Sequence, residues 1–230
     1  MPDLEGLSRS RMTRRTFCAG AAGGAVLAAV LAGGSVLAAP AIPAVLEAAR
    51  SGDSKPRKED AMELTEALFT RRSIRKFTDK PLSREDIETV LRAAMIAPSA
   101  GNAQPWEFLV LTDRAVLDAI PEISPYAAMC RTAQAAVLVC ADLAHEKFPG
   151  YWVIDCAAAI QNMLLAARGM GIGTCWTGIH PMEDRIKAFS DRFKLPQTVR
   201  PHSLIAMGWP DAEFKRMDRY KPERIHYGAY

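Results

Sequence analysis

This 230-residue chain has few cysteines and histidines, and they are not spaced as the ligands of a metal ion usually are. The five cysteines include no CxxC pair, and the four histidines (His145, His180, His202 and His226) lack the spacing of metal ligands. We therefore expect no metal site. The net charge is only +3, and no basic stripe is interleaved with aromatic residues, so nucleic acid is not an expected partner. The chain beyond the N-terminal region also lacks internal repeats and low-complexity tracts.

Charge is absent from a long stretch near the N-terminus. Residues 19–39 contain no charged side chain and consist almost entirely of Ala, Gly, Val and Leu. A basic head precedes this run, and small residues of the kind that a signal peptidase cuts after follow at Ala38, Ala39 and Ala41. This layout is typical of a signal peptide, and the paired arginines Arg14 and Arg15 in TRRTFC resemble the twin-arginine export motif.

Other interpretations of the leader fit less well. An uncleaved membrane anchor remains an alternative because about twenty apolar residues can span a bilayer, although Gly and Ala make this run weakly hydrophobic. A lipoprotein would need a small residue where Phe17 precedes Cys18. Whether the leader is cleaved after export or kept as an anchor, its basic flank should stay in the cytoplasm. We expect a twin-arginine-type signal peptide (residues 1–41), a linker (42–60) and one exported, periplasmic domain (61–230).

The domain mixes predicted helices and strands without regular alternation, which favours an α+β fold. Helices are predicted at residues 62–71, after a capping box at Ser83 and Asp86, over the apolar stretch 151–168, and around 182–193. Strands are predicted at 106–113, 133–142, 174–178 and 202–210; the second is a continuous apolar run that suits a strand covered on both faces. An exported domain could form disulfides, but the spacing of Cys130, Cys140, Cys156 and Cys175 does not define pairs.

Three clusters could carry chemistry. The first, RRSIRKF, gathers Arg71, Arg72, Ser73 and Arg75 just beyond a helix. Guanidinium groups suit phosphate oxygens, but a solvated basic turn at a helix C-terminus is an equally good interpretation.

The other two clusters are loops. APSAGNAQPW (residues 97–106) adds the amides of Asn102 and Gln104 to loop-forming residues, and an ordinary helix-to-strand connection explains it somewhat better. The glycines of GMGIGTCWTG (169–178) allow close approach of the backbone to a ligand, although a helix C-terminal turn explains this segment by itself. Because a helix precedes the strand here, the segment is not a dinucleotide fingerprint.

Together and in this order, the three motifs resemble the nitroreductase family of flavoenzymes from Leu64 to about Tyr227. The resemblance implies a mixed sheet flanked by helices, an intertwined homodimer, and FMN bound non-covalently at the subunit interface. It implies that four groups of residues bind FMN. The phosphate and ribityl chain would be bound by Arg71, Arg72, Ser73 and Arg75, and the phosphate also by Arg219, with Lys221 and Arg224 as alternatives. The ring would be reached from the partner subunit by Pro98, Ser99, Ala100 and Asn102, with Gln104 nearby, and its reactive edge would be lined by Cys175, Trp176, Thr177 and Gly178.

One departure from the family pattern bears on the substrate. Thr177-Gly178 stands where some members carry Glu-Gly, which removes a negative charge beside the flavin. No side chain is an evident nucleophile or general acid, so no catalytic residue is assigned and the cofactor is expected to supply the chemistry.

The resemblance implies an exported FMN-dependent oxidoreductase acting on a small electron-poor compound, nitro-aromatic, quinone-like or related. Dehalogenation, dehydrogenation and a non-catalytic electron-transfer role are the alternatives. Outside the inner membrane a nicotinamide donor is not expected, so membrane quinol or a periplasmic redox partner would supply the electrons.

Overall fold

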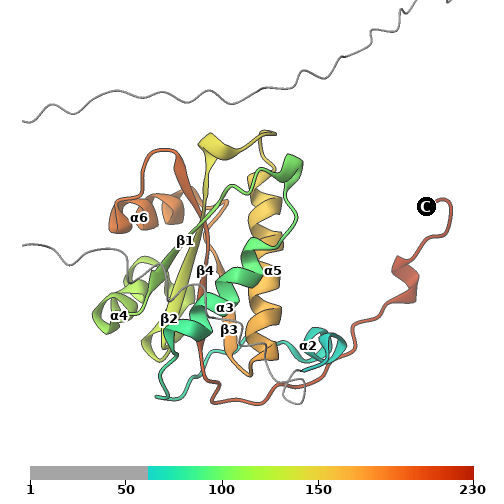
Figure 1. The fold of residues 1–230 in the computed structure, drawn as a ribbon, viewed down its shortest axis with the longest axis horizontal. Coiled ribbons are helices and arrows are strands. Elements are labelled where there is room, and N and C mark those ends of the chain that lie inside the picture. The colour runs from blue at the N-terminus through green and yellow to red at the C-terminus, as the bar shows by residue number, and fades with distance from the viewer. Residues whose placement is uncertain (1–61) are drawn as a thin grey trace, which may run out of the picture. The chain divides into compact units, whose positions relative to one another are not determined.

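The computed structural model describes residues 62–230, so the predicted signal peptide and linker lie outside the described residues (Figure 1). Four strands form one sheet in the order β1-β2-β4-β3, and every pair of neighbours is antiparallel. The α+β class is confirmed. The one parallel pairing among residues 62–230 is an isolated bridge between Ser73 and Thr174. The strands are β1 (Trp106–Leu111), β2 (Ala135–Asp142), β3 (Gly173–Gly178) and β4 (Val199–Gly208).

Helices cover both faces of the sheet, as Figure 1 shows. Helices α3 (Arg84–Met95) and α5 (Trp152–Gly169) lie on one face, and α4 (Arg114–Ile123) and α6 (Glu183–Phe193) lie on the other. Strand β2 supplies both layers because successive side chains of a strand point to opposite faces. Its odd-numbered residues join the core under α5 and its even-numbered residues join the core under α4 and α6, which confirms the predicted doubly covered strand.

The helix boundaries follow local signals. Ser83 and Asp86 form the predicted capping box at the start of α3. Helix α5 has buried residues along its whole length, and the chain turns at Gly171, whose φ is +77°. Short helix α2 (Leu64–Thr70) lies at the C-terminal end of α5, where Arg168 Nε donates to Thr70 Oγ1 at 2.9 Å.

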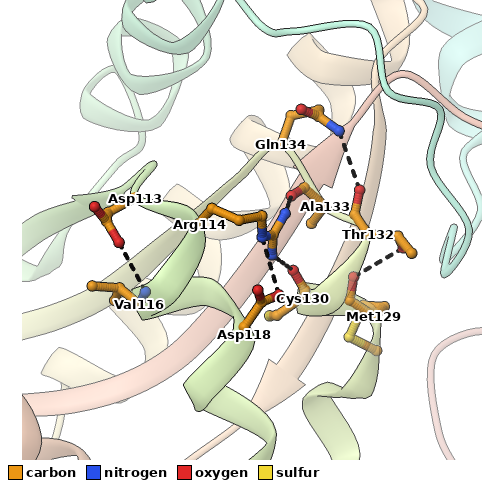
Figure 2. Close-up of polar contacts among 9 residues, drawn as sticks. All are labelled: Asp113, Arg114, Val116, Asp118, Met129, Cys130, Thr132, Ala133 and Gln134. Carbon is orange, nitrogen blue, oxygen red and sulfur yellow. Dashed lines mark hydrogen bonds and ion pairs between the residues drawn. The ribbon is translucent and has the colours of Figure 1, made fainter.

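A helical segment between β1 and β2 was not predicted from the sequence. It comprises α4 and the 3₁₀ segment η2 (Pro125–Arg131). Figure 2 shows how Arg114, the first residue of α4, holds η2 in place. Its guanidinium donates to the carbonyl of Cys130 and, at 2.8 Å, to that of Ala133, and its Nε pairs with Asp118 at 3.0 Å.

The RRSIRKF segment runs in an extended conformation beside edge strand β3. Ile74 N–H donates to Thr174 O at 2.9 Å, and Thr78 N–H donates to Trp209 O at 2.9 Å. Ile74 and Phe77 are buried, and their side chains occupy the space beside Gly173 and Gly208. A Cβ on Gly173 would come within 2.9 Å of Ile74, and one on Gly208 within 3.0 Å of Phe77. These two glycines, which are register partners between β3 and β4, therefore make room for the segment.

The chain beyond β4 forms an arm that returns past the same segment. Asp211 N–H donates to Lys76 O at 2.9 Å, and Met217 N–H donates to Phe69 O at 3.3 Å. The Arg168 guanidinium lies 4.0 Å from the centre of the Phe214 ring. The last residues are exposed, Tyr227 by 90%. None of the helices within residues 62–230 combines the length and apolar character needed to cross a bilayer.

Candidate functional site

Four arginines from two distant parts of the sequence line one cavity. Arg71 and Arg72 follow α2, and Arg216 and Arg219 arrive on the C-terminal arm. The cavity measures about 830 Å³, and we call it the arginine pocket. Its lining comprises Leu68, Phe69, Arg71, Arg72, Arg216, Met217, Asp218, Arg219 and Tyr220.

In the part of the chain that the structure describes, three arginines of the arginine pocket have no ion-pair partner, although Asp218 in its lining offsets part of the positive charge. Within residues 62–230, no carboxylate lies at ion-pair distance from Arg71, Arg72 or Arg219, whereas the neighbouring Arg216 pairs with Glu66 at 2.6 Å. Burial lowers the pKa of Arg71, and repulsion by Arg72 and Arg219 lowers it further. The Arg72 Nε is buried without a hydrogen-bond partner. Such a cluster fits an anion with several oxygen acceptors, such as a phosphate.

A second cavity, of about 480 Å³, follows the outer edge of β3, and we call it the edge pocket. Arg75 lines the edge pocket, while Arg71 and Arg72 line the arginine pocket, so one extended segment joins the two. Arg72 and Arg75 lie about 10 Å apart along an extended chain. An elongated ligand with a phosphate at one end could therefore reach both pockets. The edge pocket is lined by Arg75, Tyr126, Met129, Cys175, Trp176, Thr177, Gly178, His180, Met182 and Arg185.

Strand β3 presents to the edge pocket backbone groups that pair with no other strand of residues 62–230, and of these the Gly178 carbonyl accepts from Arg185. It pairs only with β4, and the bridge to Ser73 covers only its beginning. Since Ile74 N–H donates to Thr174 O, the backbone groups of Thr174 face the outer edge. Every second residue of an antiparallel strand faces the same way, so those of Trp176 and Gly178 also face this edge. A flat heterocycle with donors and acceptors on its rim could hydrogen-bond there.

A chain of hydrogen bonds fixes the indole of Trp176 at the same edge. Trp176 Nε1 donates to Ser203 Oγ at 2.6 Å, and Ser203 Oγ lies 2.9 Å from His202 Nδ1. His202 Nε2 lies 3.1 Å from the carbonyl of Val153, which can only accept, so Nε2 carries the proton and Nδ1 accepts from the Ser203 hydroxyl. Burial, together with the nearby His180, lowers the pKa of His202 to about 4. A neutral imidazole therefore anchors the network.

The predicted loop residues lie elsewhere in the chain. Ala100 N–H donates to Asp155 Oδ1 at 2.9 Å, which attaches the loop to the first turn of α5. The arginine pocket is beside the other end of α5, where Arg168 binds Thr70. Thirteen residues of helix separate Asp155 from Arg168, about 20 Å at 1.5 Å per residue. Pro98, Ser99, Ala100, Asn102 and Gln104 line neither pocket.

The loop is nevertheless held in a defined and strained shape. Asn102 and Gln104 have φ values of +54° and +50°, and Gly101 between Ala100 and Asn102 has +59°. Left-handed backbone at residues other than glycine costs free energy and is concentrated at functional sites. Ser99 Oγ accepts from Gln104 N–H at 2.9 Å, and Lys147 Nζ donates to Gly101 O at 2.7 Å, which stabilises this shape.

The predicted site residues divide between the two pockets, the segment that joins them, and positions outside both. Arg71, Arg72 and Arg219 line one pocket, Arg75 and residues 175–178 line the other, and Ser73 is bridged to Thr174 between them. Lys221 and Arg224 line neither pocket. Sequence reasoning missed Tyr126, Met129, His180, Met182 and Arg185, because no local pattern marks residues that only the fold brings to β3.

The cysteines take no part in covalent links within residues 62–230. Cys130, Cys140, Cys156 and Cys175 are buried free thiols. Burial raises the pKa of Cys130 and of Cys140 to about 12, so these thiols stay protonated. In this part of the chain no three His, Cys, Asp or Glu side chains are grouped to hold a metal ion.

The fold and the two joined pockets define an α+β protein with room along a sheet edge for an elongated, phosphate-bearing ligand. The Nitroreductase family model matches residues 68–209. A Methanothermobacter thermautotrophicus protein named for NADH dehydrogenase and NAD(P)H nitroreductase activity is 45% identical over 169 residues, covering 74% of this chain and 88% of the relative. This chain belongs to the nitroreductase family.

Solved structures agree with this assignment. An NADH oxidase structure from Clostridium acetobutylicum has 42% sequence identity and a TM-score of 0.70, covering 71% of this chain and 99% of that one. A nitroreductase from Desulfovibrio desulfuricans, solved in complex with FMN, has 29% identity and a TM-score of 0.65, covering 74% and 98%.

The depressed pKa of His202 predicts a pH-dependent stability. Between pH 6.5 and about 4 the unfolded chain protonates this histidine and the folded protein does not. The free energy of unfolding should therefore fall by up to about 1.4 kcal/mol per pH unit as the pH drops through this range. His202→Gln should reduce that slope in urea titrations, whereas the exposed His226→Gln should not. An unchanged slope in His202→Gln would assign the pH dependence to other groups.

Proposed function

We propose that this protein is an FMN-dependent oxidoreductase that reduces small, planar, electron-poor compounds such as nitro-aromatics or quinones. The observation that carries the proposal is the cluster of Arg71, Arg72 and Arg219, none of which forms an ion pair within residues 62–230, joined by one extended segment to the open edge of β3. FMN has a phosphate at one end of a flexible chain and a flat ring at the other. Its two ends match the two pockets.

The residues present fit FMN in defined roles. Arg71, Arg72 and Arg219 would hold the phosphate, with Ser73 beside them, and the backbone groups of Trp176 and Gly178 would contact the rim of the ring. Bound FMN supplies electron transfer between a donor and an acceptor. The protein orients the ring, holds the Trp176 indole through Ser203 and His202, and shields one side of the pocket with Met129 and Met182.

The names of related proteins support the reaction class. Relatives 45% identical to this chain are named for NAD(P)H nitroreductase activity, and a Bacillus subtilis relative at 28% identity is named an NADPH-dependent FMN reductase. Dehalogenation and a pure electron-transfer role remain the alternative functions, and catalytic turnover distinguishes them. A carrier would accept electrons without repeated turnover of nitro-aromatics, quinones or halo-aromatics.

Arg71→Gln tests the phosphate site. Removing one charge-assisted contact should cost about 1.5–3 kcal/mol, or more than about tenfold in FMN affinity, as measured by fluorescence titration. Arg84→Gln is the matched control, because Arg84 is exposed and pairs only with Glu88. The wild type should purify yellow and turn over nitro-aromatics or quinones. A colourless protein that takes up no added FMN would refute the proposed function.

We propose further that the site is completed by a second copy of the chain. The strained loop at residues 98–104 lies about 20 Å along α5 from the arginine pocket of its own chain. Its fixed shape suits a contact outside its own chain, because its residues line neither the arginine pocket nor the edge pocket. In a two-fold dimer each loop would reach the flavin of the other subunit.

Mixed dimers test this arrangement. One variant carries Arg71→Ala; the other carries Asn102→Asp with Gln104→Glu, two nearly isosteric changes that add charge to the exposed loop. Each homodimer should bind FMN poorly. Random mixing should restore about a quarter of the wild-type FMN content, since half of the dimers would contain one intact site. No recovery after subunit exchange would mean that the loop and the arginines act within one chain.

We also propose that the protein is exported in its folded state. The basic, twin-arginine leader motivates this proposal. A cofactor held non-covalently by two chains must be loaded before export, and a route that unfolds the chain would release it. An exported enzyme would then take electrons from membrane quinol or a periplasmic redox partner rather than from NAD(P)H, which is the donor that its relatives' names indicate.

Arg14→Lys together with Arg15→Lys should retain the FMN-loaded protein in the cytoplasm, as measured by fractionation and flavin fluorescence. Arg9→Lys with Arg11→Lys is the matched control outside the TRRTFC motif. Normal export of the first variant would refute the leader assignment. Rapid reduction of the wild-type flavin by low-micromolar NADH or NADPH in stopped-flow measurements would refute the proposed donor.

A further inference from the structure

The edge pocket carries unbalanced positive charge at its outer side. Arg75 and Arg185 line it. An adjoining cavity of about 340 Å³ shares Arg75, Tyr126 and Met129 with it and adds Lys76. Neither cavity has an aspartate or glutamate in its lining. Burial lowers the pKa of His180, which also lines the edge pocket, so this side chain is neutral at pH 7.

Two contacts within the protein fix the position of the Arg185 side chain. It lies in the first turn of α6, and its Nη1 donates to Gly178 O at 3.1 Å. Its guanidinium carbon lies 4.6 Å from the centre of the Tyr126 ring. Tyr126 belongs to η2, the segment that Arg114 fixes by its two carbonyl contacts (Figure 2). The orientation of Arg185 is therefore set from two elements.

The charge of Arg185 is not neutralised by a protein carboxylate. Glu183, on the same turn of α6, pairs with Arg200 at 2.5 Å. Within residues 62–230, no carboxylate lies at ion-pair distance from Arg185. The buried side chain of Thr177, on the adjoining strand, brings no charge. A guanidinium that rests on an aromatic ring with N–H groups still available presents a preorganised donor to a carboxylate.

We infer that the edge pocket selects electron-poor aromatic acceptors that bear an acidic group, a ring carboxylate or sulfonate, and that Arg185 determines this selectivity. The inference rests on the proposed function, since it assigns the substrate class of the same site. Arg75 belongs to the RRSIRKF segment, which is proposed to hold the cofactor. Arg185 is therefore the cation that can bind the acceptor. The acid group would bind Arg185 while the acceptor ring lies against the open face of the bound cofactor ring.

The step to be measured is the reduction of one nitro group. The nitro group takes up two electrons and two protons and gives a nitroso group and one water. The electrons come from the reduced cofactor, and the protons come from the cofactor and solvent. Because a carboxylate withdraws electrons less strongly than a neutral carboxamide, a preference for 4-nitrobenzoate over 4-nitrobenzamide would oppose the intrinsic order of reactivity. Such a preference would therefore show that the protein binds the carboxylate.

The experiment follows reoxidation of the FMN-loaded protein after anaerobic reduction with dithionite, which makes it independent of the physiological donor. We expect 4-nitrobenzoate to react about tenfold faster than 4-nitrobenzamide at low acceptor concentration, an effect of about 1.4 kcal/mol. Arg185→Gln should abolish the difference by slowing the benzoate selectively, with both rates measured on protein saturated with FMN. Arg192→Gln, on the exposed side of the same helix, should retain it. Added salt should reduce the preference of the wild type.

Equal rates for the two acceptors in the wild type would overturn the inference. An equal loss for both acceptors in Arg185→Gln would do so as well, because it would show a general structural role. If neither acceptor reoxidised the flavin, the proposed function would fall and the inference with it. That result is distinct from turnover without selectivity, which leaves the proposed function standing.

Discussion

The seating of Ile74 and Phe77 beside two facing glycines is the contact on which the site depends. Gly173 and Gly208 pair across β3 and β4, and the absence of a Cβ at each lets a buried side chain of the RRSIRKF segment approach the sheet. Ser73 and Arg75, on either side of the buried Ile74, are exposed. The arginines are therefore positioned by hydrophobic packing, which does not weaken when a charged ligand binds or leaves.

The same seating leaves most of β3 without a neighbour. The segment pairs with the strand only at Thr174 and then diverges, since Thr78 hydrogen-bonds beyond the end of β4. An exposed strand edge is ordinarily a liability because its unpaired groups can recruit another strand. Here it is short and lies in a cavity flanked by α6 and η2, which leaves room for a flat ligand and little for a strand.

The sequence predicted the elements whose signals are local. The capping box at Ser83, the continuous apolar run of β2 and the apolar α5 all lie where patterning placed them. Helix α4 was not predicted because Pro121 interrupts its apolar pattern. The first residues of β4 were not predicted because Pro201 lies within the strand. The arginine cluster was recognised from its composition, but its partner Arg219 was one of three similar candidates, since a basic arm contains no period that singles out one residue.

What local signals could not supply was the choice between structural and functional roles. The GMGIGTCWTG segment serves both: Gly171 forms the helix-terminating turn, Gly173 admits Ile74, and only residues 175–178 reach the pocket. The APSAGNAQPW segment is also an ordinary helix-to-strand connection within its own chain. Its left-handed residues are the feature that separates it from a simple loop, because a connection under no functional constraint could relax them. Asp155, Ser99 and Lys147 hold the strained backbone in the isolated chain, so the loop is already shaped before any partner or ligand arrives.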